Sequence, residues 1–409
     1  MKDEKKAPKL RFKGFTDDWE QCKLGDVAKI TMGQSPNSKN YTDNPKDHIL
    51  VQGNADMKDG QVHPRIWTTE ITKIADKGDL ILSVRAPVGD IGKTSYDVVI
   101  GRGVAAIKGN EFIFQLLKRM KTVGYWTKYS TGSTFESINS LEINNAVINL
   151  PKEHEQNEVG KILSYMDHAI TLHEEKKRQL ERLKSALLKK MFADKSGYPA
   201  VRFNGFCDEW KKQKLGDIVE TITDYVAAGS FASLRENVIY RSEPCYAQLI
   251  RTADLKSNFS KIAPVYVDKQ AFDFLYRVSL DKESVILPNI GNCGEVYYVD
   301  PHELPYMRNV LGPNAILIRS SSLNNHFLSI LFQSHNFQKS LKLVISPNGQ
   351  TKFNKTELKR IKMVLPMDVN EQNSLSAFFK MINTAISLQE HKSNILKELK
   401  SSLLQNMFI

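Results

Sequence analysis

The stretch RFKGFTDDWEQCKLGD at residues 11–26 returns as RFNGFCDEWKKQKLGD at residues 202–217. Ten of the sixteen positions are identical, at a constant offset of 191. A second match joins residues 155–192 to residues 371–408, where sixteen of thirty-eight positions agree at an offset of 216. The chain therefore consists of two large units, each followed by one long segment. Two copies at so long a period are too few for a solenoid, and they predict a pseudo-dimer with an approximate two-fold axis.

Composition indicates an ordinary globular protein. The chain has 409 residues, of which 41% are hydrophobic and 25% charged, and this length allows about two to four domains. No apolar run approaches the ~20 residues of a membrane helix, and no apolar stretch follows the charged N-terminus as in a secretory signal. The four cysteines form no CxxC pair. We therefore expect neither a disulfide framework nor a zinc site, and a cytoplasmic location.

The chain is basic, with a net charge of +11. By segment the charge is +4 for residues 1–150, +2 for 151–195, +5 for 196–366 and 0 for 367–409. Because the excess lies on the two large units and not on a tail, it favours a polyanion that both units bind. The alternative is that the basic residues serve solubility alone.

Each large unit mixes short strands with turns, which predicts α+β domains of about 150–170 residues. Each unit should also contain a helix, then a loop rich in Ser, Thr and Gly, and a closing strand that ends in Leu-Pro. In the first unit the strands are expected at 79–84 and 97–100, the helix at 111–123, the loop at 130–135 and the closing strand at 147–151. In the second the strands are expected at 284–287, 295–299 and 315–318, the helix at 324–340, the loop at 346–351 and the closing strand at 364–366.

The segments 154–192 and 371–408 carry apolar residues three and four positions apart, which predicts two long helices with coiled-coil spacing. A helix over the first segment would be ~58 Å long. So long an amphipathic helix needs a partner, and the two-fold relation makes the other copy an antiparallel one. The alternative is two independent helices, each packed on its own domain. The residues predicted to pack between the helices are Ile162, Met166, Ile170, Leu180, Leu183, Leu187, Met191, Phe378, Ile382, Ile386, Leu396, Leu399, Leu403 and Met407.

No pattern in the sequence indicates catalysis. Gly92-Lys93-Thr94 suggests a phosphate loop, but Pro87 stands where that loop needs glycine. Residues 101–106 fit a loose dinucleotide pattern, yet no helix can open there and no acidic residue follows at the required distance. Arg102 and its flanking glycines instead suit a loop that approaches an anion. No histidine pair has metal-ligand spacing, so we expect no active site, metal or cofactor on this chain.

The irregular parts of both units carry the residue types that contact DNA: Arg and Lys for guanine and phosphate, Asn and Gln for adenine, and Ser for phosphate. Each of these residues alone is more often a solvated surface residue. The units resemble each other least in these regions, as expected for two modules that read different bases. The candidates are Gln34, Ser35, Arg65, Arg85, Arg102, Lys128, Ser133 and Thr134 in the first unit, and Arg235, Arg241, Arg251, Asn289, Asn292, Arg308, Asn309, Asn348, Gln350 and Lys352 in the second.

These features together resemble a known family, the specificity (S) subunits of type I restriction–modification enzymes. The resemblance covers essentially the whole chain. Its marks are Gly-Phe, Trp and Leu-Gly-Asp at the start of each unit, the run GDLILSVRAPVG at 78–89, Leu-Pro before Glu-Gln-Asn at each helix start, and Leu-Leu-x-x-Met-Phe at each helix end. The second unit departs from the middle pattern and reads SVILPNIG at 284–291.

The resemblance implies a non-catalytic, DNA-reading subunit. Each unit would be a target recognition domain for one half of a split, asymmetric site, and the helical pair would fix the spacer between the halves. The pair would also dock two methyltransferase (M) subunits, and two restriction/translocase (R) subunits would join the complex. S-adenosylmethionine, ATP and Mg²⁺ are expected on those partners. The implied division is 1–151 for recognition domain 1, 152–195 for spacer helix 1, 196–366 for recognition domain 2 and 367–409 for spacer helix 2.

Two further interpretations fit the sequence less well. The chain would serve a type II-like system that carries cleavage and methylation on one fused polypeptide, or it would be a scaffold that binds two copies of a protein partner without nucleic acid. The basic charge of both units argues against the scaffold. An enzyme in its own right is the least favoured interpretation.

Overall fold

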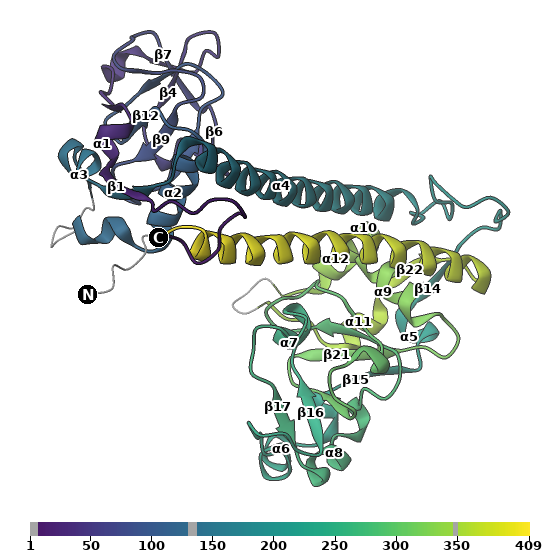
Figure 1. Cartoon of the computed structure of the whole chain (residues 1–409). Coiled ribbons are helices and arrows are strands. Elements are labelled where there is room, and N and C mark those ends of the chain that lie inside the picture. The colour runs from purple at the N-terminus through teal and green to yellow at the C-terminus, as the bar shows by residue number, and fades with distance from the viewer. Residues whose placement is uncertain (1–6, 130–136, 347–350) are drawn as a thin grey trace. The chain divides into compact units, whose positions relative to one another are not determined.

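The computed structural model describes residues 7–129, 137–346 and 351–409 (Figure 1). The chain forms two compact units. Unit 1 comprises residues 1–175 and 389–409, and unit 2 comprises residues 176–388. Each unit therefore contains a part of each of the two long helices, whereas the four predicted parts follow the chain in order. That four-part division stays a prediction.

Unit 1 contains two sheets and a strand pair. β1 (Glu20–Lys23) pairs antiparallel with β13 (Val147–Leu150). A six-stranded sheet has the order β2 (Ile30–Met32), β12 (Val104–Ile107), β9 (Leu80–Ser83), β10 (Ile91–Lys93), β6 (Gln61–Val62), β5 (Met57–Lys58). A five-stranded sheet has the order β3 (Tyr41–Thr42), β7 (Ile66–Thr68), β4 (His48–Val51), β11 (Val98–Ile100), β8 (Ile74–Ala75). The helices are α1 (Leu24–Val27), α2 (Glu111–Thr122) and α3 (Ser140–Asn144), with short 3-10 turns at Ser38–Asn40, Asn54–Asp56 and Tyr125–Tyr129.

Unit 2 repeats the central part of this plan with shorter sheets. β14 (Lys211–Lys214) pairs antiparallel with β22 (Lys362–Leu365). The sheets are β15 (Thr221–Asp224), β21 (Ala315–Arg319), β18 (Ser284–Pro288), β19 (Tyr297–Val299), and β17 (Val265–Val267), β16 (Ala247–Ile250), β20 (Asn309–Leu311). The helices are α5 (Leu215–Ile218), α6 (Phe231–Asn237), α7 (Thr252–Lys256), α8 (Lys269–Phe274), α9 (Asn325–Gln333), α10 (His335–Val344) and α11 (Lys355–Arg360), with 3-10 turns at Tyr225–Ala228, Tyr276–Val278 and Pro301–Glu303.

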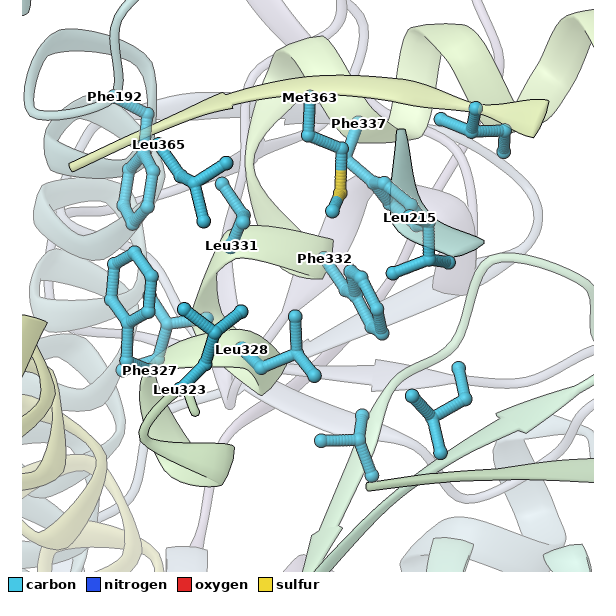
Figure 2. Close-up of a cluster of buried hydrophobic side chains, with 14 of the residues drawn as sticks. Phe192, Leu215, Leu323, Phe327, Leu328, Leu331, Phe332, Phe337, Met363 and Leu365 are labelled. Carbon is cyan, nitrogen blue, oxygen red and sulfur yellow. The ribbon is translucent and has the colours of Figure 1, made fainter. Parts of the chain in front are cut away.

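The predicted single helix at 324–340 is wrong, because two helices, α9 and α10, meet at Ser334. Ser334 has extended backbone, and its hydroxyl accepts a hydrogen bond from the amide of Phe337. A serine at this position caps the second helix instead of continuing the first. The break lets α9 enter the core of unit 2, where Leu331 and Phe332 lie near Met363 and Leu365 of β22 (Figure 2).

The two long helices that the sequence predicts are present. α4 spans Glu153–Lys190 and α12 spans Val369–Asn406, each with 38 residues. In unit 1 they lie antiparallel, because Asp167 of α4 pairs with Lys400 of α12 at 2.6 Å, and His173, further along α4, bonds to Gln389, earlier in α12, at 2.7 Å. In unit 2 the end of α4 likewise meets the first turns of α12 in one core cluster.

Most residues predicted to pack between the helices are buried or half-buried, and several also pack into the domain cores. Leu183 and Leu399 are exceptions, with 49% and 50% of their surface exposed. The inward position at that turn belongs to the next residue, a lysine in both copies. Lys184 bonds to Gln333 and Lys400 to Asp167. The predicted apolar stripe of each helix is therefore wider than the surface that the helix buries, and the leucines at its outer edge are exposed.

The repeated sequence motifs form equivalent contacts in the two units. Arg11 makes a two-pronged ion pair with Glu155 at the start of α4, and Arg202 makes the same pair with Glu371 at the start of α12. Each repeat also begins with an amide that bonds to the end of a long helix. The amide of Leu10 donates to Asn406, and that of Val201 donates to Lys190. The sequence repeat is thus a repeat of packing around each helix end.

Candidate nucleic-acid interface

Four chain segments of unit 1 meet where the parallel strands β4 and β11 end. Ile100 lies beside Val51 in the register of this pair, so the residues that follow both strands emerge at one edge. The amide of Gly101 donates to the carbonyl of Val51 at 2.8 Å, and the amide of Val84 donates to that of Gly103 at 2.9 Å. Residues 33–35, 52–54, 83–86 and 101–103 are thereby brought together.

Glycines in and beside the Gly101-Arg102-Gly103 turn allow its backbone to lie very close to the backbone of neighbouring segments. A Cβ on Gly103 would lie 2.0 Å from the carbonyl oxygen of Gln52, and one on Gly33 would lie 2.0 Å from that of Gly101. No side chain fits at such distances. The turn therefore packs directly on the neighbouring strand ends and leaves Arg102 exposed.

These segments enclose a cleft of about 380 Å³, which we call the unit 1 cleft. Its lining has two arginines, polar amide and hydroxyl side chains, and no acidic residue. Arg85 and Arg102 are exposed, and their guanidinium groups have no hydrogen-bond partner in the described part of the chain. Arginine, glutamine, asparagine and serine are the types that contact base edges and phosphates. The lining residues are Ser35, Gln52, Gly53, Asn54, Ser83, Arg85, Ala86, Arg102 and Gly103.

A buried carboxylate holds one wall of the cleft. Asp56, 5% exposed, accepts hydrogen bonds from the amides of Gln52 at 2.8 Å and Gly53 at 3.3 Å. Arg65 donates to the carbonyl of Ala55 at 2.9 Å and lies 3.9 Å from the Asp56 carboxylate. The predicted contact residue Arg65 therefore bonds to the backbone of this loop.

The other unit 1 candidates lie around the cleft or away from it. Ser35 accepts a hydrogen bond from the amide of Arg102 at 3.1 Å. Gln34 is exposed, and its carbonyl accepts a bond from Thr72. The ammonium of Lys128 lies 3.6 Å from the ring centre of Tyr125, outside the cleft lining. Ser133 and Thr134 lie outside the described residues, but Ser137, just after them, pairs with Arg85.

Unit 2 has an equivalent framework with different side chains. Its β16 and β20 are parallel, as β4 and β11 are, and the amide of Gly312 donates to the carbonyl of Ile250 at 2.8 Å. Where unit 1 has Arg102 in the turn, unit 2 has Pro313. Where Gln52 follows the strand, unit 2 has Arg251. The backbone of Asn289 joins this region through a bond from its amide to Asn314.

Arg251 is held by a buried carboxylate. Its Nε and Nη2 donate to Asp254 at 2.8 and 2.7 Å, and Nη2 also donates to the carbonyl of Ala263. The bond to the Asp254 carboxylate raises the pKa of Arg251, and the nearby charge of Asp254 adds to this against the effect of burial. Nη1 has no such bond in the described chain, so it is the part of the guanidinium that remains free to donate to a ligand.

The remaining unit 2 candidates fall into two groups. Asn289 and Lys352 lie on neighbouring paired segments, because Lys352 bridges to Ile290 and the carbonyl of Asn289 accepts from Phe353. Asn292 is exposed in the turn that follows Ile290, whereas Asn348 and Gln350 lie outside the described residues. This group lies beside the Arg251 site, as Arg85 lies beside Gln52.

The second group lies away from that site. Arg241 pairs with Asp268, and Arg308 stacks on Tyr246 at 4.6 Å, both near the start of β16 and opposite to Arg251. Asn309 is 4% exposed and donates to the carbonyl of Tyr306. This interior position does not support the predicted contact of Asn309 with DNA, because the side chain completes the turn before β20. Arg235 is exposed on α6.

Sequence reasoning missed Gln52 and Asn54, which line the unit 1 cleft. The strand that precedes them, β4, is short and was not predicted. Its signal was the run Ile49-Leu50-Val51 directly before Gln-Gly-Asn, an apolar strand followed by a polar turn.

The described residues contain no group of three or more His, Cys, Asp or Glu side chains arranged to hold a metal ion. None of the helices in that same part of the chain combines the length and apolar composition that crossing a lipid bilayer requires.

Comparison with known proteins gives one consistent result. A family model described as "Type I restriction modification DNA specificity domain" matches residues 16–182 and again residues 207–398. The two matches fall on the two halves of the internal repeat and together cover most of the chain.

Similar curated proteins come from Methanocaldococcus jannaschii. The putative type I restriction enzyme MjaX specificity subunit is 32% identical over 44% of this chain and 44% of its own length. The MjaIX specificity subunit is 25% identical over 54% of each chain, and the MjaVIII specificity subunit is 20% identical over 95% of this chain and 91% of its own. The match thus spans about half the length of the first two relatives.

Two solved structures share the fold. The crystal structure of the type I restriction-modification system S subunit from M. genitalium has a TM-score of 0.65 and 14% identity, covering 98% of this chain and 99% of that one. A chain from a study of complex assembly and conformational transition of the type I R-M system has a TM-score of 0.52 and 16% identity, covering 95% and 97%.

Proposed function

We infer that this chain, which belongs to the type I restriction modification DNA specificity family, is the DNA-reading subunit of a type I restriction–modification complex. Each unit would bind one half of a bipartite, asymmetric duplex site. One observation carries the proposal: both units place solvent-accessible or half-buried arginine and amide side chains on the same strand-end framework, and those side chains differ between the units.

The framework suits DNA because one set of residues holds the backbone in place and a different set is left to contact a ligand. Buried carboxylates and glycines hold the backbone, whereas Arg85 and Arg102 project without partners in the described chain. Their charge, with the net charge of +11, would neutralise phosphates, and the amide groups would distinguish bases. The division into two recognition domains, 1–151 and 196–366, and two spacer helices, 152–195 and 367–409, belongs to this proposal.

The long helices would set the gap between the half-sites. A 38-residue helix is ~57 Å long, and a duplex rises ~3.4 Å per base pair. Four residues inserted after Glu174, with four more at the equivalent Glu390, add ~6 Å to each helix. We expect a longer gap with both half-sites unchanged, measured by mapping methylated sites. An unchanged gap would contradict the proposal that helix length sets the distance between the half-sites.

The helices also carry a second apolar surface, which we call the outer stripe. Leu172 and Leu388 are 63% and 46% exposed, and Leu183 and Leu399 are about as exposed. These are equivalent positions of the repeat, so the same exposed leucine occurs twice. Exposed apolar residues that recur in this way suit a partner that binds twice. We propose that the outer stripe docks two methyltransferase subunits.

The docking proposal predicts a loss of assembly. Leu172→Glu with Leu388→Glu places charge on the outer stripe in both copies and should abolish co-purification with an adenine methyltransferase of this system. Ser185→Glu, an exposed position off the stripe, is the matched control. Equal capture by both variants would count against this surface.

Chemistry would belong to the partners. We propose that methyltransferase subunits supply S-adenosylmethionine-dependent adenine methylation and that two restriction/translocase subunits supply ATP- and Mg²⁺-dependent cleavage, in the cytoplasm where chromosomal DNA lies. On this chain we propose no active site.

The test of the proposed function is binding of the full-length chain to a randomised duplex library at two salt concentrations. We expect a gapped site with two conserved halves, and affinity that falls steeply with salt because phosphate contacts release counterions. A single uninterrupted motif, or binding that salt leaves unchanged, would refute the proposal.

A further inference from the structure

We propose that residue 52 in unit 1 and its counterpart, residue 251 in unit 2, determine one base pair of each half-site: Gln52 selects an adenine, and Arg251 selects a guanine. The inference rests on the proposed function and names what part of the site each unit reads.

The two positions are equivalent by their backbone contacts. Gln52 follows β4 and Arg251 follows β16, each the central strand that pairs in parallel with β11 or β20. A short helical turn follows both, after Gly53 in unit 1 and directly after Arg251 in unit 2, and it contains a buried aspartate, Asp56 or Asp254. That aspartate accepts the amide of residue 52 or 251 at 2.8 Å in both units. The same support thus carries different side chains.

Gln52 lines the unit 1 cleft, and its side-chain amide makes no hydrogen bond within the described chain. The side chain is half-buried. Its Cγ lies against Gly101, which limits the positions that the amide can take. A carboxamide offers one acceptor and one donor side by side, which matches N6 and N7 of adenine in the major groove.

Arg251 has the opposite hydrogen-bonding character. Asp254 fixes the plane of the guanidinium through two bonds, and Nη1 is left without a partner in the described chain. A group that only donates suits the O6 and N7 acceptors of guanine, and it meets the N6 donor of adenine unfavourably. The fixed plane also reduces the side-chain entropy lost on binding.

Both substitutions keep the backbone support, but Arg251→Gln also removes the two side-chain bonds to the buried Asp254. Asp56 binds the backbone amide of Gln52, so Gln52→Ala keeps that bond and the turn. A phosphate contact would be a different role: its loss weakens binding to all sequences nearly equally, whereas loss of a base contact relaxes the preference at one position.

The experiment uses the full-length chain, a randomised duplex library and sequencing of the bound fraction. For Gln52→Ala we expect the adenine preference at one position of one half-site to fall about tenfold or more, with the other half-site and the gap unchanged. Gln52→Arg should replace that adenine by guanine. Arg251→Gln should change one position of the other half-site from guanine to adenine, which tests unit 2 independently. Gln21→Ala, at an exposed strand position, is the control.

The outcomes separate the inference from the proposed function. If the wild type selects a gapped site and Gln52→Ala and Arg251→Gln select the same one, the inference is wrong and the proposed function stands. Uniform weakening on all sequences assigns these residues to phosphates and also overturns the inference. A wild-type chain that selects no gapped site refutes both.

Discussion

The paired ion bridges at the helix starts predict an unequal response to the same substitution. Glu371 is 2% exposed and accepts bonds from Arg202 at 2.7 and 2.8 Å and from the indole N–H of Trp210 at 3.2 Å. Its counterpart Glu155 accepts two bonds from Arg11, at 2.6 and 2.7 Å. The indole N–H of Trp19 is buried without a partner in the described chain. Replacing the glutamate by glutamine therefore disturbs more hydrogen bonds in unit 2 than in unit 1.

The magnitude follows from these contacts. Loss of the carboxylate charge leaves a largely buried arginine uncompensated, which costs about 3–5 kcal/mol in the unit concerned. In unit 2 the NH₂ group of glutamine also replaces one of the two oxygens that share the indole N–H of Trp210, at 3.2 Å each, which weakens that bond at a cost of about 1 kcal/mol. We expect Glu371→Gln to destabilise unit 2 by about 1 kcal/mol more than Glu155→Gln destabilises unit 1.

The tryptophans allow this difference to be measured. The chain has four: Trp19, Trp67 and Trp126 belong to unit 1, and Trp210 belongs to unit 2. Labelled with 5-fluorotryptophan, each gives its own fluorine resonance, and urea titration of these signals reports each unit separately. The double variant Arg202→Met with Glu371→Leu is the control and should cost only about 1–2 kcal/mol, because it removes both buried charges and leaves only the indole N–H of Trp210 without an acceptor. Equal losses for the two glutamine variants, or a loss below about 1 kcal/mol, would refute the reasoning.

Three further predictions concern the helices and the cleft. Burial lowers the pKa of Lys400 to about 8. Between pH 8 and its ordinary pKa of 10.5, the unfolded chain holds a proton that the folded chain has released, so the free energy of unfolding rises with pH. Lys400→Met should abolish that rise in urea titrations at different pH, and Lys392→Met, at an exposed position, should not. Replacing both His173 and Gln389 by leucine should raise the melting temperature but loosen the helix register, seen as mixed oligomers in light scattering. Gly103→Ala should lower stability by about 1–3 kcal/mol in chemical unfolding and weaken DNA binding, because its Cβ has no room.

The sequence was a good guide where its signals are periodic or repeated. The motif repeat indicated two similar units, and the 3-4 spacing indicated α4 and α12 to within a few residues. Local patterns of this kind arise because a helix or strand repeats its geometry along the chain. The side to which a residue on such a helix turns was less certain: Leu183 fits the spacing but is exposed, because Lys184 takes the inward position.

The candidate site depends on contacts that no local pattern contains. Gln52 became a candidate only once β4 and β11 were seen to end together. Arg251 fits the prediction by type, but the prediction could not show that Asp254 holds its guanidinium. Asn309 shows the reverse case, since its type suits DNA but its position is interior. Residue type gives the chemistry available, and long-range packing decides which residues present it.

The ends of the units show why linear boundaries are an imperfect description of this chain. Trp19 of unit 1 packs its ring against Phe408, at the very end of the chain, as Trp210 of unit 2 packs against Phe192 directly after α4. Met407 and Phe408 belong to the buried core of unit 1, although about 380 residues separate them from its first strand. Unit 1 is therefore assembled from two stretches that lie far apart in the sequence, residues 1–175 and 389–409. Its counterpart obtains the same two core residues, Met191 and Phe192, from the segment that leads into it, so the two units share one packing scheme and differ in how the chain supplies it.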